Sequence, residues 1–150
     1  MTVGIDPGVT GAVSIIGGGM CEVHDLPMLR VHSKAYVNSP ELLSLLQRVR
    51  PKLIVVELAG ARQRQGVSSI TQTWLVYGGV VATALSTGCT LEIVHPLKWK
   101  RRLGLLGADK EASRLKALQL FPKLGQELKR KKDHNRAEAL LLAHYGLSVH

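Results

Sequence analysis

Residues 1–13, MTVGIDPGVTGAV, decide the predicted fold. Residues 2–6 form an apolar run typical of a short buried strand, and residues 11–16, GAVSII, form a second one. The PGVT between them is too short for a crossover connection, so we expect an antiparallel hairpin. The first strand ends at Asp6, and an acid at the end of a buried strand is costly unless a partner holds it. The rest of the sequence must supply that partner.

The remaining hydrophobic pattern predicts a helix followed by a parallel strand. Residues 52–57, KLIVVE, are continuously apolar up to Glu57, as in a strand that is buried on both faces of a sheet. The helix before this strand is expected to be capped by Ser39, with Pro40 at its first position, and to stop at Pro51. Two more strands are expected, at 20–26 and at 90–94. A helix is expected at 70–85, capped by Ser68 or Ser69, and a short basic segment starts at Pro96. Two further helices are expected, one from 108 or 109 to 120 and a final one from 133–135 to Tyr145, with Gly146 as its stop.

This order of elements predicts one α/β domain over residues 1–150. We expect a mixed five-stranded sheet flanked by helices, in which the first three strands are antiparallel and the last two are parallel. No apolar run reaches the length of a membrane span, and the N-terminus lacks a signal-peptide pattern, so the sequence predicts a cytoplasmic protein with no membrane partner. Cys21 and Cys89 are far apart and are expected to be free thiols rather than zinc ligands.

The charge of the chain indicates a polyanionic partner. Twenty Lys and Arg against eleven Asp and Glu give a net charge of +9, and a basic excess of this size favours nucleic acid. The alternative is a solubility charge spread over the surface, but the basic residues cluster. The clusters are Arg62 with Arg64, Lys98 with Lys100, Arg101 and Arg102, and residues 129–132. One Phe and two Trp are too few for an RNA-recognition sheet with a row of stacking aromatics.

Asp6 and Glu57 are the first candidate metal ligands. Each ends an apolar strand, and if the two strands are neighbours and parallel, both acids lie at the C-terminal edge of the sheet, where α/β sheets bind ligands. Adjacent carboxylates repel each other unless a cation joins them, and hard oxygen ligands suit Mg²⁺ or Mn²⁺. The alternatives are a turn residue for Asp6 and a surface acid at a strand end for Glu57.

A third acid is expected from residues 133–146, DHNRAEALLLAHYG. Glu138 precedes an apolar run and shares a helix face with His134 and Asn135. Asp133 falls about 140° away from Glu138 on a regular helix, so the two can share a metal only if Asp133 lies on the lead-in before the helix. The alternatives are an N-cap for Asp133 and a first-turn acid for Glu138.

Four stretches together resemble the RuvC-type Holliday-junction resolvases, most closely their phage-like branch. The stretches are GIDPGVTGAV, the strand ending VVE, the P-x-x-W-K segment with GADKEASRLKALQLFP, and DHNRAEALLLAHYG. They occur in the order of that family and cover nearly the whole chain. The resemblance implies a ribonuclease H-like fold, a homodimer in a bacterial or phage-infected cell, and cleavage of four-way DNA junctions with two divalent metals per site, leaving 5′-phosphate and 3′-hydroxyl ends.

The resemblance also implies roles for individual residues. Asp6, Glu57 and Glu138 take the places of three metal ligands. The family spacing would put the remaining acid at Asn135, so Asp133 becomes the nearest acid, with His134 and Asn135 as alternates. Lys100 and Lys110 match basic positions near the family's site, where either could act in catalysis by stabilising the pentacovalent phosphate, or could neutralise the neighbouring strand. The alternative for each is an ordinary solvated surface lysine. Contacts to DNA are expected from Arg62, Arg64, Lys98, Lys100, Arg101 and Lys110.

One helix and three rival functions remain open at the level of sequence. Gly78 and Gly79 lower helix propensity, so the segment WLVYGGVVATAL is either a core helix or one that another backbone approaches closely, as at a dimer interface. The first rival function is an ATPase of the actin-like type, whose phosphate-binding turn resembles DPGVTG but which needs two such domains. The second is a related nuclease that acts on RNA, on flaps or on other branched DNA. The third is a non-catalytic DNA-binding module.

Overall fold

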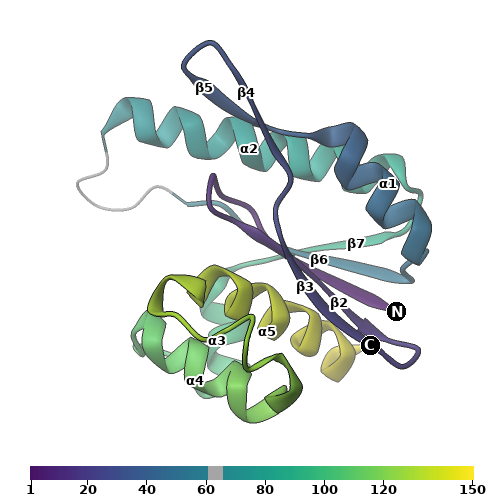
Figure 1. Cartoon of the computed structure of the whole chain (residues 1–150), viewed down its shortest axis with the longest axis vertical. Helices are drawn as coiled ribbons and strands as arrows, with labels where there is room; N and C mark the ends of the chain where they lie inside the picture. Colours follow the sequence, from purple (N-terminus) through teal and green to yellow (C-terminus); the bar gives the residue numbers. More distant parts are fainter. Residues whose placement is uncertain (61–65) are drawn as a thin grey trace.

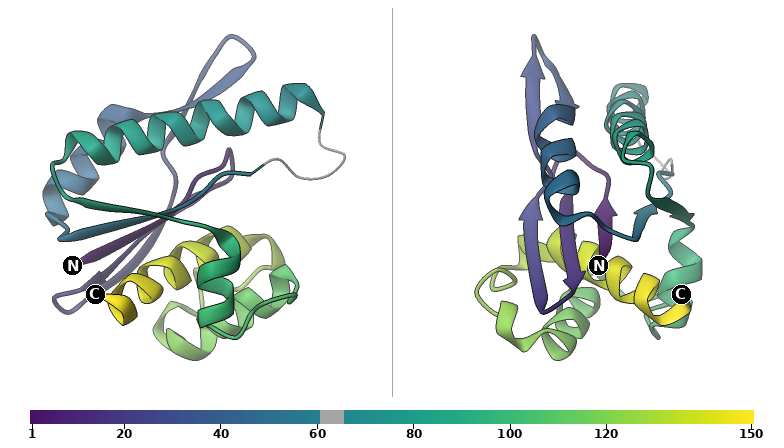
Figure 2. Two further views of the ribbon diagram at one scale, coloured as in Figure 1. Left: turned by 180° about the vertical axis from the view of Figure 1, so that it is seen from behind. Right: turned by 90° about the vertical axis from the view of Figure 1, so that its right-hand side faces the viewer.

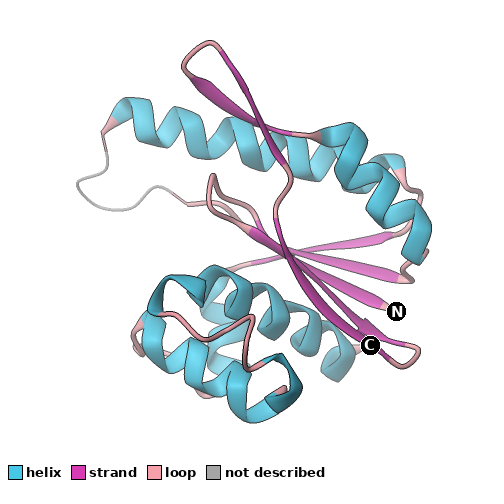
Figure 3. Ribbon diagram, in the orientation of Figure 1, coloured by secondary structure: helices cyan, strands magenta, loops and turns pink. Residues whose placement is uncertain are grey.

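The computed structural model describes residues 1–60 and 66–150. Figure 1 shows the chain in sequence colours, and Figure 3 separates its helices from its strands. In chain order the elements are β1 (Thr2–Asp6), β2 (Ala12–Gly17), β3 (Met20–Asp25), β4 (Met28–Val31), β5 (Lys34–Val37), α1 (Ser39–Val49), β6 (Leu53–Glu57), α2 (Val67–Ser86), β7 (Thr90–Val94), α3 (Pro96–Arg102), α4 (Lys110–Leu120), η1 (Pro122–Leu124), η2 (Lys131–Asp133) and α5 (His134–Val149).

The main sheet has five strands in the order β3-β2-β1-β6-β7. Strand β1 pairs antiparallel with β2, and β2 pairs antiparallel with β3. Strand β6 runs parallel to both β1 and β7. The predicted mixed sheet is therefore confirmed, including the parallel pairing of the two strands that end in Asp6 and Glu57.

Helices cover both faces of this sheet (Figures 1 and 2). Helices α1 and α2 pack on one face, and α5 packs on the other with α3 and α4 beside it. Strand β6 shows why its sequence is continuously apolar. Ile54 and Val56 belong to the core under α1 and α2, whereas Leu53 and Val55 belong to the core under α5. Burial of both sets holds β6, and with it Glu57, in a fixed position.

Helix α5 lies unusually close to β1 and β2. A side chain at Gly4 would collide with the backbone of Ala139 and Ala143, and the Ser14 hydroxyl donates to the carbonyl of Ala139 over 2.7 Å. The prediction that Gly146 stops this helix is wrong, because α5 continues to Val149. Gly146 is instead a close-packing position, since a Cβ there would come within 2.7 Å of Val55.

Three other details differ from the sequence-based expectation. Residues 28–37, expected to be loop, form the β4–β5 hairpin, which stands apart from the main sheet and packs on α2 (Figure 2). Helix α2 starts at Val67 after an N-cap at Gly66, not after Ser68 or Ser69. Helix α1 does contain Pro40 in its first turn, but its N-cap residue is Asn38.

Within residues 1–60 and 66–150, no helix has the length and apolar character needed to cross a membrane.

Candidate active site

A cavity of about 580 Å³ opens where β1 and β6 end. The parallel register pairs Ile5 with Val56, so the next residues, Asp6 and Glu57, are level with each other on adjacent strands. The β1–β2 turn, the start of α3, the start of α4 and the start of α5 complete the wall. The lining residues are Asp6, Pro7, Gly8, Thr10, Glu57, Leu58, Ala59, Gly60, Thr73, His95, Pro96, Lys100, Lys110, His134 and Asn135. The structure thus brings the two strand-end acids to one cavity.

Helix α3 fixes the orientation of Glu57. The indole Nε1–H of Trp99 donates to Glu57 Oε2 over 2.7 Å, and the Trp99 side chain is fully buried. A buried indole has few alternative rotamers, so this hydrogen bond holds the carboxylate in one direction. The sequence reasoning did not single out Trp99 as a partner of Glu57, although the P-x-x-W-K segment contained it.

The next residue along α3 reaches the third acid. The ammonium of Lys100 lies 3.0 Å from Glu138 Oε1, and it also sits 5.1 Å from the centre of the Trp99 ring. Glu138 is buried, so its charge needs this partner or another cation. Glu57, Trp99, Lys100 and Glu138 therefore form a continuous chain of polar and cation–π contacts, in which Glu57 and Lys100 line the cavity and the buried Trp99 and Glu138 lie outside its lining.

Two further pairs close the other side of the cavity. Lys110 Nζ lies 3.0 Å from His134 Nε2, which joins the starts of α4 and α5. The side-chain amide of Asn135 donates to Thr10, with 2.9 Å to the hydroxyl oxygen, and so ties α5 to the β1–β2 turn. Thr10, Thr73 and His95 also line the cavity and carried no sequence signal. The His95 ring accepts from the backbone N–H of Leu97 and caps α3.

Two of the four predicted acidic ligands, Asp133 and Glu138, are not part of the cavity lining, and Asp133 is paired with Arg130. Asp133 lies on the lead-in η2 directly before α5, as the sequence reasoning required. Its oxygens accept the Arg130 backbone N–H over 2.8 Å and the Arg130 guanidinium over 2.8 to 3.2 Å. These Arg130 hydrogen bonds lower the pKa of the Asp133 carboxyl below its ordinary value despite burial. Asp133 is also not a side-chain N-cap of α5.

The residues around the cavity suit a hard divalent cation by donor type. Asp6, Glu57 and Glu138 supply carboxylate oxygens, which are the ligands that Mg²⁺ and Mn²⁺ prefer. Among residues 1–60 and 66–150, no three His, Cys, Asp or Glu side chains stand grouped closely enough to hold an ion as they are. The third carboxylate is paired with the Lys100 ammonium, which neutralises Glu138 in this arrangement. A cation shared by all three acids would therefore have to replace Lys100 at Glu138.

The predicted DNA contacts have different surroundings. Lys100 and Lys110 line the cavity. Lys98 is exposed, lies 3.3 Å from Glu92 and stands over the Tyr145 ring, and Arg101 is exposed on α3. Arg62 and Arg64 lie outside the described residues.

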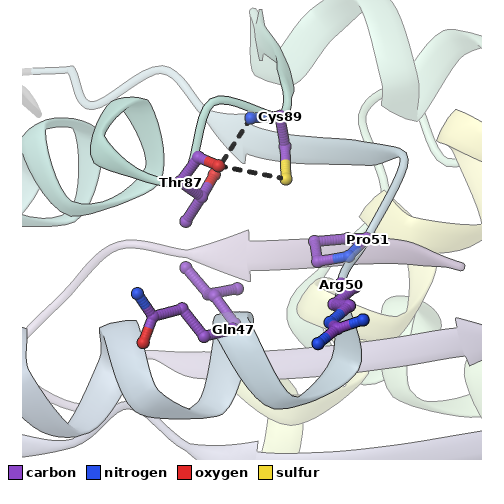
Figure 4. Close-up of a pocket in the computed structure, with 6 residues that line it drawn as sticks. Gln47, Arg50, Pro51, Thr87 and Cys89 are labelled. Carbon is purple, nitrogen blue, oxygen red and sulfur yellow. Dashed lines mark hydrogen bonds between the residues drawn. The ribbon is translucent and has the colours of Figure 1, made fainter.

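A second hollow lies at the opposite end of the sheet and has different chemistry (Figure 4). It has a volume of about 380 Å³ and is lined by Leu46, Gln47, Arg50, Pro51, Thr87 and Cys89. Thr87 holds Cys89 through a hydrogen bond of 3.2 Å from the Cys89 backbone N–H. This hollow contains no carboxylate or imidazole, so the cavity at Asp6 and Glu57 is the better metal site.

Known structures share this arrangement of strands and helices. A Thermus thermophilus RuvC structure in complex with a Holliday junction substrate matches with a TM-score of 0.61 and 21% identity, over 96% of this chain and 90% of that one. The fold is that of RuvC. A second Thermus thermophilus RuvC structure matches with a TM-score of 0.57 and 22% identity, over 96% of this chain and 91% of that one. The ribonuclease H-like architecture expected from the sequence is thereby confirmed, with the β4–β5 hairpin as a detail that was not anticipated.

One curated relative is similar in sequence to part of this chain. It is the chloroplastic Holliday junction resolvase MOC1 of Chlamydomonas reinhardtii, with 37% identity over 84 residues. The matched part is 55% of this chain but only 9% of that protein's length. No protein-family model matches the chain.

Proposed function

We propose that this chain is a divalent-metal-dependent endonuclease that cuts four-way DNA junctions, with residues 1–150 as one nuclease domain. The observation that carries the proposal is the position of Asp6 and Glu57, which end adjacent parallel strands and line one cavity together with Lys100 and Lys110. The RuvC fold and the partial similarity to a junction resolvase support the choice of substrate. The net charge of +9 supports a polyanionic one.

The acids and lysines would divide the work of phosphodiester hydrolysis. Asp6, Glu57 and Glu138 would hold Mg²⁺ or Mn²⁺, two ions per site by the resemblance. The fourth position would fall to His134 or Asn135, which line the cavity, rather than to Asp133, whose carboxylate is held by Arg130. A bound ion would lower the pKa of water and stabilise the leaving oxygen. Trp99 keeps a Glu57 oxygen fixed for this task.

Lys100 and Lys110 would act on the phosphate itself. If a cation took the place of Lys100 at Glu138, the Lys100 ammonium would be free to lie beside the charged phosphate oxygens, where positive charge stabilises the transition state. Lys110 is held at the opposite wall by His134. Attack by water in line with the 3′ oxygen would leave 5′-phosphate and 3′-hydroxyl ends, as in the family that the sequence resembles.

We also propose that the protein acts as a homodimer through α2. The outward face of this helix carries an exposed stripe of apolar and small residues, namely Val67, Trp74, Leu75, Gly78, Ala82 and Leu85. Space is open around the Cβ position of Gly78, so a second backbone can approach there, whereas Gly79 faces Val37 of the hairpin within the same chain. Two copies related by a two-fold axis would place one cavity on each of two opposed strands of a junction.

A non-catalytic DNA-binding module is the second candidate, and the Lys100–Glu138 pair is the observation that favours it. Cleavage assays with Mg²⁺ or Mn²⁺ separate the candidates. The substrates are a fixed four-way junction, a flap, a linear duplex and a structured RNA of equal length. The nuclease proposal predicts cleavage of the junction that is lost in Asp6→Asn while binding persists. Junction binding without any cleavage by the wild type would instead identify the binding module. Stronger cleavage of the RNA or the flap than of the junction would show that the nuclease acts on that substrate instead.

A further inference from the structure

The positive charge of this protein is concentrated in one part of the fold. Residues 96–133, which comprise α3, α4, η1, η2 and their connections, contain twelve Lys and Arg but only four Asp and Glu, a net charge of +8. The remaining 112 residues contain eight Lys and Arg and seven Asp and Glu, a net charge of +1. The sheet and the α1–α2 layer are therefore almost neutral, and the attraction for a polyanion comes from the segment at 96–133.

The last part of this segment is basic and is held by hydrogen bonds between Arg130 and Asp133. The Arg130 backbone and guanidinium both donate to Asp133, which is 4% exposed, so η2 is closed on itself. Arg130 and Asp133 neutralise each other in this way. Lys129, Lys131 and Lys132 remain, and all three are exposed. We call these three residues the basic ridge.

The basic ridge continues directly into the wall of the candidate active site. The carbonyl of Lys131 lies 3.3 Å from His134 Nδ1, and the other nitrogen of the same ring contacts Lys110. Lys110 and His134 both line the cavity that contains Asp6 and Glu57. The backbone of the ridge is therefore linked through His134 and Lys110 to the lining of the cavity.

We propose that the basic ridge binds the phosphate backbone of a duplex DNA arm that extends from the cavity. This inference rests on the proposed function, because it takes DNA as the polyanion. Fixed lysines next to a cleavage site bind backbone without reading sequence, so they set affinity and register rather than sequence preference. The ridge should bind the arms of a junction and a linear duplex alike, since either presents the same backbone.

The test compares two double variants that remove the same charge. The first variant, Lys131→Gln/Lys132→Gln, alters the ridge. The control variant, Arg48→Gln/Lys52→Gln, alters two exposed residues near the end of α1 and just before β6, at the end of the sheet opposite the cavity. Binding of a fluorescent four-way junction and of a linear duplex is measured in EDTA, where no metal-dependent cleavage occurs, between 50 and 200 mM salt.

The ridge variant should bind both DNAs about tenfold or more weakly at the lower salt concentration, and its slope of log affinity against log salt should fall by about 1.8, or 0.9 for each lost phosphate contact. The control variant should stay close to wild type, and Lys131→Arg/Lys132→Arg should restore binding. Equal losses in the two double variants would overturn the inference, because they would reflect net charge alone. If the ridge variant shows the smaller salt slope but the wild type never cuts a junction with Mg²⁺ or Mn²⁺, the proposed nuclease is refuted and the ridge is not. If the wild type cuts the junction but the ridge variant has the same salt slope as the wild type, only the ridge is refuted.

Discussion

The indole N–H of Trp99 donates to Glu57 over 2.7 Å, while its neighbour Lys100 contacts Glu138 over 3.0 Å. Two adjacent residues of one short helix therefore reach acids from two different parts of the chain. Because α3 begins directly after β7, which pairs with β6, its position is fixed by the sheet itself. Helix α3 thus links the Glu57 and Glu138 carboxylates, which belong to β6 and α5.

Replacing Trp99 by Phe should separate the hydrogen bond from the packing. The variant keeps an aromatic ring in the core but loses the donor to Glu57, and outer contacts of this kind usually change metal affinity or activity by about 10- to 100-fold. We expect a loss of junction cleavage within that range, with a higher metal concentration needed for half-maximal rate. Tyr36→Phe, which removes a polar group from an exposed aromatic side chain of β5, is the control. Wild-type cleavage by Trp99→Phe would show that Glu57 needs no orienting donor.

Replacing Lys100 by Gln should have opposite effects on metal binding and on cleavage. Removing the ammonium leaves Glu138 without its cation, so the variant should bind Mn²⁺ more tightly than wild type, by about tenfold, in calorimetric titrations without DNA. Cleavage at saturating metal should fall, because the variant has no ammonium to stabilise the negative charge on the phosphate in the transition state. Lys98→Gln, which loses a contact to Glu92 instead, serves as control. Unchanged Mn²⁺ affinity would mean that Glu138 takes no part in metal binding.

His144 should make the fold sensitive to mild acid. Burial, with a smaller contribution from Lys116, lowers the pKa of His144, whose ring packs edge-on against Phe121 at 5.8 Å between centroids. As pH falls below about 6.5, the unfolded chain takes up this proton before the folded one, so the stability contributed by neutral His144 is present above that pH and lost as pH falls through the lowered value. The melting temperature of wild type should therefore drop between pH 7.5 and 5.5.

The His144→Phe variant provides the comparison for this pH effect. It keeps an aromatic partner for Phe121 but removes the titrating group, so its melting temperature should depend less on pH over the same interval. Parallel curves for wild type and His144→Phe would show that another group controls acid stability.

A charge on the outward face of α2 should break the proposed dimer. Leu75 is 37% exposed, and burying a new carboxylate against a partner helix is costly, so Leu75→Glu should raise the dimer dissociation constant by about a hundredfold or more in sedimentation experiments. Leu115→Glu adds the same charge at an exposed leucine of α4 and should leave assembly unchanged. Monomeric wild-type protein at high concentration would remove the basis for a two-fold complex on junction DNA.

The hydrophobic pattern was sufficient to predict the mixed sheet and the placement of Asp6 and Glu57 at the same end of two adjacent strands. Each acid ends a strand that is buried on both faces, and parallel pairing leaves no other place for the two ends. The β4–β5 hairpin was missed because its strands have four residues each, too few for a clear alternation of polar and apolar positions. Its stability comes from packing on α2 and from the Gln72 side chain, which bonds both backbone groups of Ala35.

Side-chain partners were beyond what spacing alone can predict. Asp133 does lie on the lead-in to α5, yet Arg130, three residues earlier in an irregular segment, holds its carboxylate. Trp99 appeared in a recognised motif, but its hydrogen bond to Glu57 depends on the angle at which α3 leaves β7. Gly146 looked like a helix stop because glycine commonly follows a last turn, whereas here it admits Val55 of the sheet.

Anomalous scattering from Mn²⁺ in crystals of this protein tests the central claim most directly. We expect a Mn²⁺ peak in the cavity, with oxygens of both Asp6 and Glu57 at about 2 to 2.5 Å and the Lys100 ammonium moved away from Glu138. Crystals of Asp6→Asn grown under the same conditions should lack the peak. A peak bound elsewhere, or none at a Mn²⁺ concentration that supports cleavage, would contradict a metal site shared by these carboxylates.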